Sequence, residues 1–191
     1  LAQAYGAVMT LTGRPEDPPT FCAPAINDVS TGMWSVIGIL AALQQRNRTG
    51  EGCVIDTSLF ESAVSWVSGP LNNYHQSGNA PKRFGGASAT LVPYQTFDTA
   101  DHPICIAAGN NRLFDKCAKV LGHPEWTTDP RFKTGPDRAA HRDELLALIM
   151  PVLRTQPRAH WLAELTKVGV PNSPVNDIPD LSKSEQLKEM D

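Results

Sequence analysis

The chain has 191 residues, of which 41% are hydrophobic, and it carries 17 lysines and arginines against 20 aspartates and glutamates. This length allows one domain or two small ones, and so high a hydrophobic fraction excludes a disordered chain. The net charge of −3 argues against a nucleic-acid-binding surface and against a basic, membrane-binding patch. We therefore expect neither nucleic acid nor a membrane as a partner.

Apolar stretches and cysteines point to a reducing, aqueous compartment. The longest apolar stretch, residues 33–43, is far shorter than the roughly 20 residues that span a bilayer, and no secretion signal opens the chain. The cysteines form no CxxC pair and lack metal-ligand spacing; they are Cys22, Cys53, Cys105 and Cys117. We expect reduced thiols, no bound metal and a cytoplasmic location. Because an expected helix starts at Leu1 without a methionine, we interpret the chain as having lost residues or as a piece of a larger protein.

Three segments are expected before residue 47. Small and apolar residues at helical spacing predict a helix over residues 1–12, which Gly13 ends. Four prolines indicate a loop over residues 13–27. Residues 29–46 are apolar on nearly all sides, which is typical of a helix buried on most of its faces.

A short strand is expected next, over residues 53–55. Residues 56–58 supply three side chains that can cap a following helix. Apolar residues at steps of three and four run along that helix to Tyr74, and Pro70 should kink it. Residues 76–86 are polar and contain glycine, so we expect a domain boundary there.

The second half of the chain mixes strands and helices. Residues 91–97 and 104–108 predict two strands joined as a hairpin. Asn110 or Asn111 can cap a helix that Gly122 ends.

Two further helices and one extended segment complete the pattern. Leucine and isoleucine at helical spacing predict a helix around residues 145–153, and another helix starts near Pro157 and ends at Gly169. Residues 170–175 contain two prolines, so they can form only an edge strand or an extended loop.

Asp28 is the most informative single residue. It follows the proline-rich loop and directly precedes the expected buried helix. A carboxylate at that place can cap the helix, which stabilises it by about 1 kcal/mol. It can also act as a nucleophile that a loop displays and the helix dipole keeps ionised. Position alone favours the cap.

Two other groups of residues leave a similar choice open. Gly85 and Gly86 form either a flexible turn or a loop whose amides approach a reacting oxyanion. Arg138, His141 and Arg142 share one face of an expected helix and can bind an anion, although a solvated face is the more common outcome.

Several segments, taken in order, form a recognisable set: Pro24–Gly32, Ile37–Leu43, Arg48–Gly52, Ile55–Asp56, Arg83–Gly85, Val92–Phe97, Gly109–Asn111, Asp129–Phe132 and Gly169–Pro171. This set resembles the family III CoA-transferases, the CaiB–BaiF family, over essentially the whole chain. The stretch from Arg83 to Phe97 is most similar to the branch that uses succinyl-CoA and small dicarboxylic acids.

The resemblance implies a role for Asp28. The aspartate of the Asp-x-x-x-Gly segment is the nucleophile in that family, and Asp28 occupies this position. It would attack a donor acyl-CoA to give an aspartyl anhydride and then an aspartyl-CoA thioester, while Gly85 and Gly86 stabilise or shield the intermediates. The implied partners are an acyl-CoA substrate and a small carboxylic acid, with no tightly bound cofactor.

The resemblance also implies a fold. Chains of the family are about twice as long, begin with a Rossmann-like half and form interlocked dimers. We therefore expect an α/β family fragment in which residues 1–84 are the helical part of the large domain, residues 85–178 a small α+β domain and residues 179–191 the start of a return segment or a tail. A homo-oligomer, in the form of a dimer, is expected.

Two alternative functions remain. The chain can be an acyl-CoA racemase, in which Asp28 would act as acid and base, although the segment around Tyr94 favours the transferase. It can also be a catalytically inactive, truncated module that self-associates through apolar surface around residues 33–43.

Overall fold

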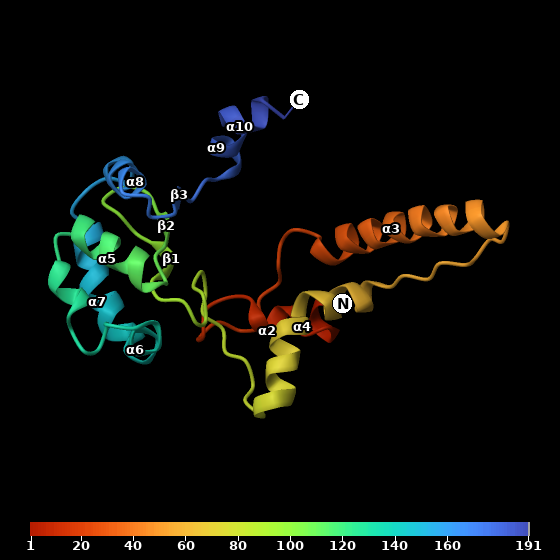
Figure 1. The fold of residues 1–191 in the computed structure, drawn as a ribbon, viewed down its shortest axis with the longest axis horizontal. Coiled ribbons are helices and arrows are strands. Elements are labelled where there is room, and N and C mark those ends of the chain that lie inside the picture. Colours follow the sequence, from red (N-terminus) through yellow and green to blue (C-terminus); the bar gives the residue numbers. More distant parts are fainter. Residues whose placement is uncertain (191) are drawn as a thin grey trace. The chain divides into compact units, whose positions relative to one another are not determined.

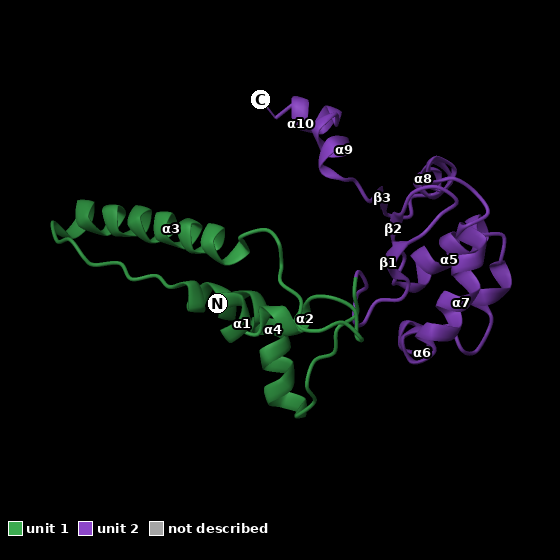
Figure 2. Ribbon diagram, turned by 180° about the vertical axis from the view of Figure 1, so that it is seen from behind, with its two compact units in different colours: residues 1–85 green, residues 86–191 purple. Residues whose placement is uncertain are grey.

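The computed structural model describes residues 1–190, and the chain forms two compact units, Leu1–Gly85 and Gly86–Asp191 (Figure 1, Figure 2). The first unit is helical, and the second combines helices with a small sheet. The helices of the first unit are α1 (Ala2–Tyr5), α2 (Val8–Leu11), α3 (Ile26–Thr49) and α4 (Leu59–Ser77).

The expected helix over residues 1–12 is interrupted in the structure. Ala7 has a left-handed backbone with φ of 62°, which separates α1 from α2. Gly6 lies against α4 so closely that a Cβ there would come within 2.4 Å of the Cβ of Ala63. The helix is therefore interrupted where the backbone passes close to α4. The spacing of apolar residues does not reveal this close approach.

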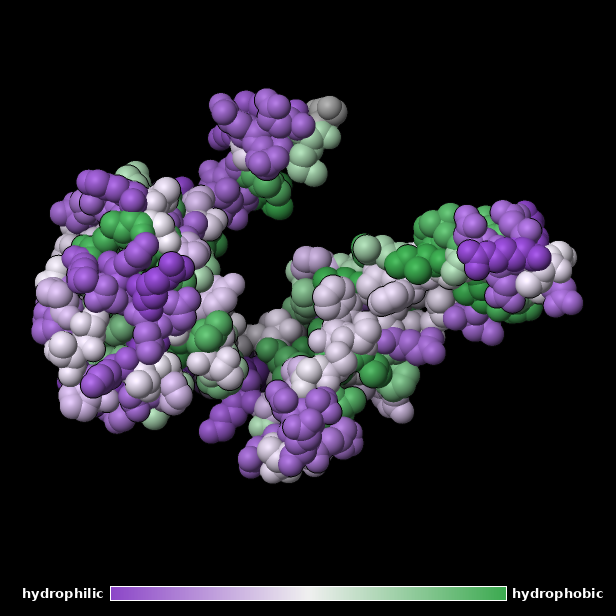
Figure 3. Space-filling view, viewed as in Figure 1, coloured by the Kyte–Doolittle hydropathy of each residue, from purple (hydrophilic) through white to green (hydrophobic). Residues whose placement is uncertain are grey.

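Helix α3 forms where it is expected but is not buried. It starts at Ile26 and ends where Gly50 takes a left-handed backbone. Most of its large apolar side chains are exposed, and Figure 3 shows hydrophobic surface over the helix. The prediction of a helix buried on most faces is therefore wrong for the described chain. The physical reason is that α3 packs on α4 near its start, and no second layer from this unit covers the rest (Figure 1).

The length of α3 also contradicts the expectation that no apolar segment of this chain is long enough to span a bilayer. Its 24 residues make it, within residues 1–190, the one helix long and apolar enough to cross a bilayer by length and composition. One such helix does not by itself indicate a membrane protein, because a core helix of a soluble protein has the same properties.

Between α3 and α4 the expected strand over residues 53–55 is absent. The segment is extended and exposed, and among the described residues no strand pairs with it. Helix α4 begins as expected: the Ser58 hydroxyl oxygen accepts the amide of Glu61 at 3.1 Å. Pro70 lies inside this helix, and the ribbon of α4 changes direction along its length (Figure 1).

The second unit contains an antiparallel sheet in the order β1-β2-β3. The expected hairpin is confirmed as β1 (Tyr94–Phe97) and β2 (Ile104–Ala107), with Phe97 paired to Ile104. The expected edge strand is confirmed as β3 (Asn172–Pro174), where Pro174 pairs with Ile104. Proline is tolerated there because an edge strand needs fewer amide donors.

Helices of the second unit follow their local signals. They are α5 (Asn111–Val120), the 3-10 helix η1 (Pro124–Thr127), α6 (Gly135–Ala140), α7 (Arg142–Leu153), α8 (Arg158–Lys167), α9 (Ile178–Ser182) and α10 (Glu185–Lys188). Asn110 caps α5 by accepting the amide of Leu113 at 2.9 Å. One buried cluster joins side chains of the sheet, α5, α7 and α8. This unit therefore encloses its own core.

Candidate active site

Asp28 lies in the first turn of α3, on the exposed surface. The helix starts three residues earlier than expected, so its N-cap is Ala25 and no side chain caps it. The interpretation of Asp28 as the capping residue is therefore wrong. As the third residue of the helix, its carboxylate lies near the positive end of the helix dipole.

The face of α3 that carries Asn27 and Ser30 packs on α4. Successive residues of a helix are about 100° apart, so Asp28 lies about 100° around the helix from Asn27 and next to Thr31, at the edge of this face. Asn27 and Ser30 are buried, with 2% and 7% of their surface exposed. Packing on this face thus leaves the adjoining side of the helix, with the Asp28 carboxylate, exposed.

Two hydrogen-bond chains connect α4 to the first turn of α3. In the first, the Trp66 indole N–H donates to Ser30 Oγ at 3.1 Å, and the Ser30 hydroxyl donates to the Ile26 carbonyl at 2.7 Å. In the second, the Thr31 hydroxyl donates to the Asn27 carbonyl at 2.6 Å and lies 2.7 Å from Ser62 Oγ. Because the Thr31 proton is already donated, Ser62 is the donor of that pair.

Unlike Ser30 and Thr31, the Asn27 side chain forms no hydrogen bond with the described residues at the start of α3. Its amide nitrogen and oxygen are both buried, and neither has a hydrogen-bond partner among residues 1–190. A buried polar group without a partner costs about 1–3 kcal/mol. The first turn of α3 therefore needs other interactions to hold it in place.

Gly85 closes a loop within the first unit. Its φ of 61° lies in the left-handed region, and its amide donates to the Gly13 carbonyl at 3.0 Å. Arg83 reinforces the same contact by donating to the carbonyls of Asp17 and Pro15. The Gly85 amide is thus engaged by the backbone in this conformation.

Gly86 opens the second unit and lies close to the sheet. A Cβ at this position would come within 2.7 Å of Thr96 Oγ1. This close approach explains why a residue without a side chain stands here, independently of any role in catalysis.

Arg138 and its neighbours form neither an anion site nor a solvated face. Arg138 is completely buried and donates to the carbonyls of Val92, Phe132 and Gly109 at 2.8, 3.0 and 2.8 Å. Burial lowers the pKa of this guanidinium. Both interpretations from the sequence are therefore wrong for Arg138, because its donors are used to join loops of the second unit.

Its two neighbours also bond to backbone. Arg142 donates to the Ser88 carbonyl at 2.6 Å, and His141 Nδ1 lies 3.0 Å from the Asp137 carbonyl. These contacts hold the start of α7 in place, and they do not form a ligand site.

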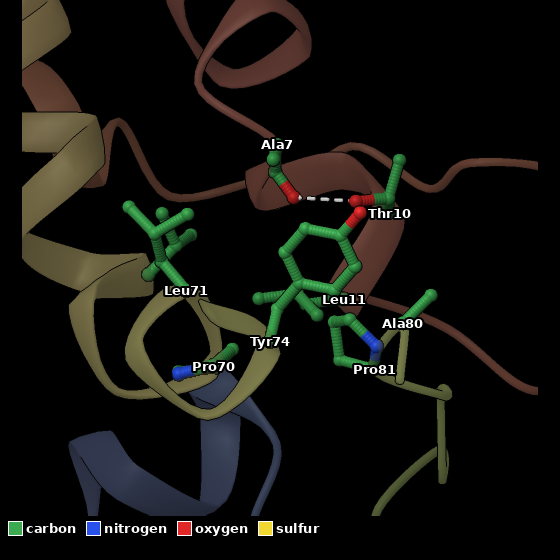
Figure 4. Close-up of a pocket in the computed structure, with 9 residues that line it drawn as sticks. Ala7, Thr10, Leu11, Pro70, Leu71, Tyr74, Ala80 and Pro81 are labelled. Atoms are coloured by element: carbon green, nitrogen blue, oxygen red, sulfur yellow. Dashed lines mark hydrogen bonds between the residues drawn. The ribbon is translucent and has the colours of Figure 1, made fainter. Parts of the chain in front are cut away.

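An apolar pocket of about 320 Å³ lies elsewhere in the first unit (Figure 4). The residues around it come from α2, from α4 on both sides of its bend and from the following loop: Ala7, Thr10, Leu11, Val67, Pro70, Leu71, Tyr74, Ala80 and Pro81. None of the predicted site residues lines it. Sequence reasoning missed this pocket because its lining residues come from segments that are far apart in the sequence. In the described part of the chain, no group of three His, Cys, Asp or Glu side chains could hold a metal ion.

Comparison with known proteins decides the family. The sequence pattern of CoA-transferase family III matches residues 1–191. The chain belongs to this family. The resemblance identified from the sequence is therefore confirmed.

Several characterised relatives are similar over nearly the whole chain. It is 36% identical to the acetyl-CoA:oxalate CoA-transferase of Acetobacter aceti, over 97% of this chain and 48% of that enzyme. It is 33% identical to the succinyl-CoA:glutarate CoA-transferase of Mus musculus, over 98% of this chain and 43% of that enzyme. The chain thus spans about half the length of the relatives it matches.

Solved structures give the same result. A CAIB/BAIF family protein from Brucella suis is 39% identical and superimposes with a TM-score of 0.84, covering 98% of this chain and 50% of that protein. A mixed helical fold with a small antiparallel sheet therefore agrees with a structure of the family.

Proposed function

We propose that this protein transfers CoA between an acyl-CoA and a small carboxylic or dicarboxylic acid, with Asp28 as the nucleophile. The observation that carries the proposal is the exposure of Asp28 in the first turn of α3, beside the face that packs on α4, in a chain of CoA-transferase family III. Relatives named for oxalate and glutarate support a dicarboxylic acceptor.

In the first half of the proposed reaction, a carboxylate oxygen of Asp28 attacks the thioester carbonyl of the donor. The carbon–sulfur bond breaks, CoA leaves as a thiolate and a mixed anhydride forms. The thiolate then attacks the Asp28 carbonyl carbon, which releases the donor acid and leaves an aspartyl-CoA thioester. Covalent catalysis of this kind divides one difficult exchange into easier steps.

In the second half, a carboxylate oxygen of the acceptor attacks the aspartyl thioester and displaces the CoA thiolate. The thiolate then attacks the acceptor side of the new anhydride, which gives the product acyl-CoA and restores the Asp28 carboxylate. One thioester replaces another, so the overall exchange needs no external energy source.

Gly85 and Gly86 are proposed to stabilise or shield these intermediates. Amide donors near a developing oxyanion are among the strongest contributions to acyl-transfer catalysis. Since the Gly85 amide donates to Gly13, the Gly86 amide is the first candidate for such a donor. Gly85 contributes through its left-handed backbone, which sets the course of the loop.

The exposed apolar face of α3 bears on assembly. It is defined by Met33, Trp34, Ile37, Leu40 and Leu43, each with 38% or more of its surface exposed. We propose that this face is covered by a second copy in a homodimer, since large apolar patches mark protein interfaces. We further propose that residues 1–84 belong to the large domain of the family, residues 85–178 to the small domain, and that the protein acts in the cytoplasm.

Covalent trapping tests the role of Asp28. The native-length protein is incubated with succinyl-CoA and then with hydroxylamine, which converts an aspartyl thioester or anhydride to a hydroxamate. We expect peptide mass analysis to find the modification on Asp28. The Asp28→Asn variant should lose it, while Asp56→Asn, at another exposed aspartate of the same unit, should keep it.

Two outcomes would contradict the transferase. An unmodified Asp28 in an oligomer that shows no CoA-dependent mass shift would indicate an inactive module. Exchange of the α-hydrogen of a 2-methylacyl-CoA with solvent deuterium, with Asp28 unacylated, would indicate a racemase.

A further inference from the structure

The start of α3 is held from another helix rather than by its own residues. Helices are usually stabilised at this end by a capping side chain, but Ala25 provides none. Asn27 adds a buried amide without a partner among the described residues, which opposes the observed conformation. The turn that carries Asp28 would therefore fray if nothing else fixed it.

The two hydrogen-bond chains from α4 supply that fixation. Their final acceptors are the carbonyls of Ile26 and Asn27, which lie directly before Asp28 in the chain. A serine or threonine hydroxyl that bonds back to a carbonyl four residues earlier tends to bend a helix unless its geometry is fixed. Here the Trp66 indole and the Ser62 hydroxyl bind the two hydroxyls and fix them.

Packing of α4 fixes the Ser62 donor. Ser62 has 2% of its surface exposed, and next to it Ala63 and Val67 form the small buried cluster of the first unit with Val8. Ile26, the first residue of α3, packs against the same cluster. The Ser62 donor and the start of α3 therefore share one packed base, and Trp66, which has 56% of its surface exposed, is joined to it by the hydrogen bond to Ser30.

We propose that Ser62 and Trp66 are positioning residues that hold the Asp28 carboxylate in its reactive direction through Thr31 and Ser30. This inference rests on the proposed role of Asp28 as the nucleophile. Neither residue lies within 30 positions of Asp28 in the sequence, so the arrangement exists only in the folded chain.

The test compares the rate of Asp28 trapping by hydroxylamine, with succinyl-CoA as donor, among variants of the native-length protein. Ser62→Ala and Trp66→Phe each remove one donor and keep most of the side chain. We expect each to lower the trapping rate at saturating donor about 5- to 10-fold, with the half-saturating donor concentration unchanged. The matched control is Ser65→Ala, because the Ser65 hydroxyl donates within α4 to the Ser62 carbonyl and should leave the rate unchanged.

Combinations of variants separate positioning from a general loss of stability. Ser62 and Thr31 belong to the same hydrogen-bond chain, so adding Thr31→Val to Ser62→Ala should lower the trapping rate little further. Trp66 belongs to the other hydrogen-bond chain, so the rate losses of Trp66→Phe and Ser62→Ala should multiply in the double variant. Thr31→Ser keeps the hydroxyl and should restore most of the rate lost in Thr31→Val. Rates equal to those of Ser65→Ala throughout would overturn the inference.

Amide hydrogen exchange gives a second, independent test. The amides of Ser30 and Thr31 should exchange faster in Ser62→Ala and Trp66→Phe than in Ser65→Ala, because the start of α3 opens more often. Equal exchange in all three variants would overturn the inference even if Asp28 is trapped. Absence of trapping in the unaltered protein would instead overturn the proposed function, while faster exchange would still support the fixation of the turn.

Discussion

The two units of this chain bury their apolar residues to very different extents. Within the described residues, the second unit has a cluster of seventeen buried hydrophobic side chains, drawn from β1, β2, α5, α7 and α8 and the loops between them. The first unit has three: Val8, Ala63 and Val67. Both units contain apolar helices, so the difference lies in whether a unit's own elements cover its apolar faces.

This difference teaches how each unit obtains its stability. The second unit can fold around a core made of its own residues, because burial of apolar surface is the main favourable term in folding. The first unit depends on the contact of α1, α2 and the start of α3 with α4. Its candidate nucleophile therefore stands on the less enclosed of the two units, next to apolar surface that remains open.

The largest expected effect comes from Arg138, whose donors join three loops of the second unit. Arg138→Met would keep much of the side-chain volume but lose hydrogen bonds to the carbonyls of Val92, Phe132 and Gly109. We expect the free energy of unfolding of this unit to fall by about 3–5 kcal/mol, measured by urea denaturation. The control, Arg112→Met, alters an exposed arginine at the start of α5. Equal denaturation midpoints for the two variants would show that the buried guanidinium is not needed.

A matched pair of leucines sharpens the comparison between the units. Leu165 of α8 is fully buried, whereas Leu40 of α3 has 58% of its surface exposed. Leu165→Ala should lower the free energy of unfolding by about 3 kcal/mol, because it removes buried methyl groups and leaves a cavity. Leu40→Ala should cost less than about 0.5 kcal/mol in dilute protein. A cost at Leu40 that grows with protein concentration would show that a second copy covers α3.

Local signals in the sequence predicted most helix and strand boundaries of the second unit. Asn110 caps α5, Gly122 follows it with a left-handed backbone, and the prolines of residues 170–175 occur on an edge strand. These features depend on neighbouring residues, so no knowledge of the fold is needed to predict them. Arg138, His141 and Arg142 were expected on one helix, but α6 ends at Ala140 and α7 begins at Arg142. Thr134 and Asp137 form a capping box at the start of α6, a local signal that the prediction did not use.

Predictions that required knowledge of distant residues were wrong or absent. The apolar pattern of α3 indicated burial, but burial depends on what lies over the helix. Arg138 was expected on a solvated face because of its residue type, and its carbonyl partners come from loops far away in the sequence. For the candidate site, the sequence indicated Asp28, but the hydrogen bonds from Ser62 and Trp66 across two helices could not be predicted from spacing.

The smallest expected effect concerns acid stability of the second unit at Asp101. The backbone amide of Arg158 at the start of α8 donates to its carboxylate at 2.7 Å, and the Thr99 hydroxyl donates at 2.8 Å. These bonds, the Arg158 amide first, lower the pKa of Asp101 to about 2. Because the pKa is lower in the folded state, the carboxylate stabilises the fold at pH values above its unfolded pKa, and this contribution is lost as the pH falls from about 4 toward about 2.

Asp101→Asn tests this contribution because it keeps an acceptor oxygen but cannot titrate. Urea denaturation at several pH values should show the unaltered protein to be more stable than the variant near neutral pH, with the gap closing between about pH 4 and pH 2. The effect should be modest, because the carboxylate is solvent-accessible and water screens its interactions. A gap that stays constant through this pH range would mean that the link between the β1–β2 turn and α8 does not depend on the charge of Asp101.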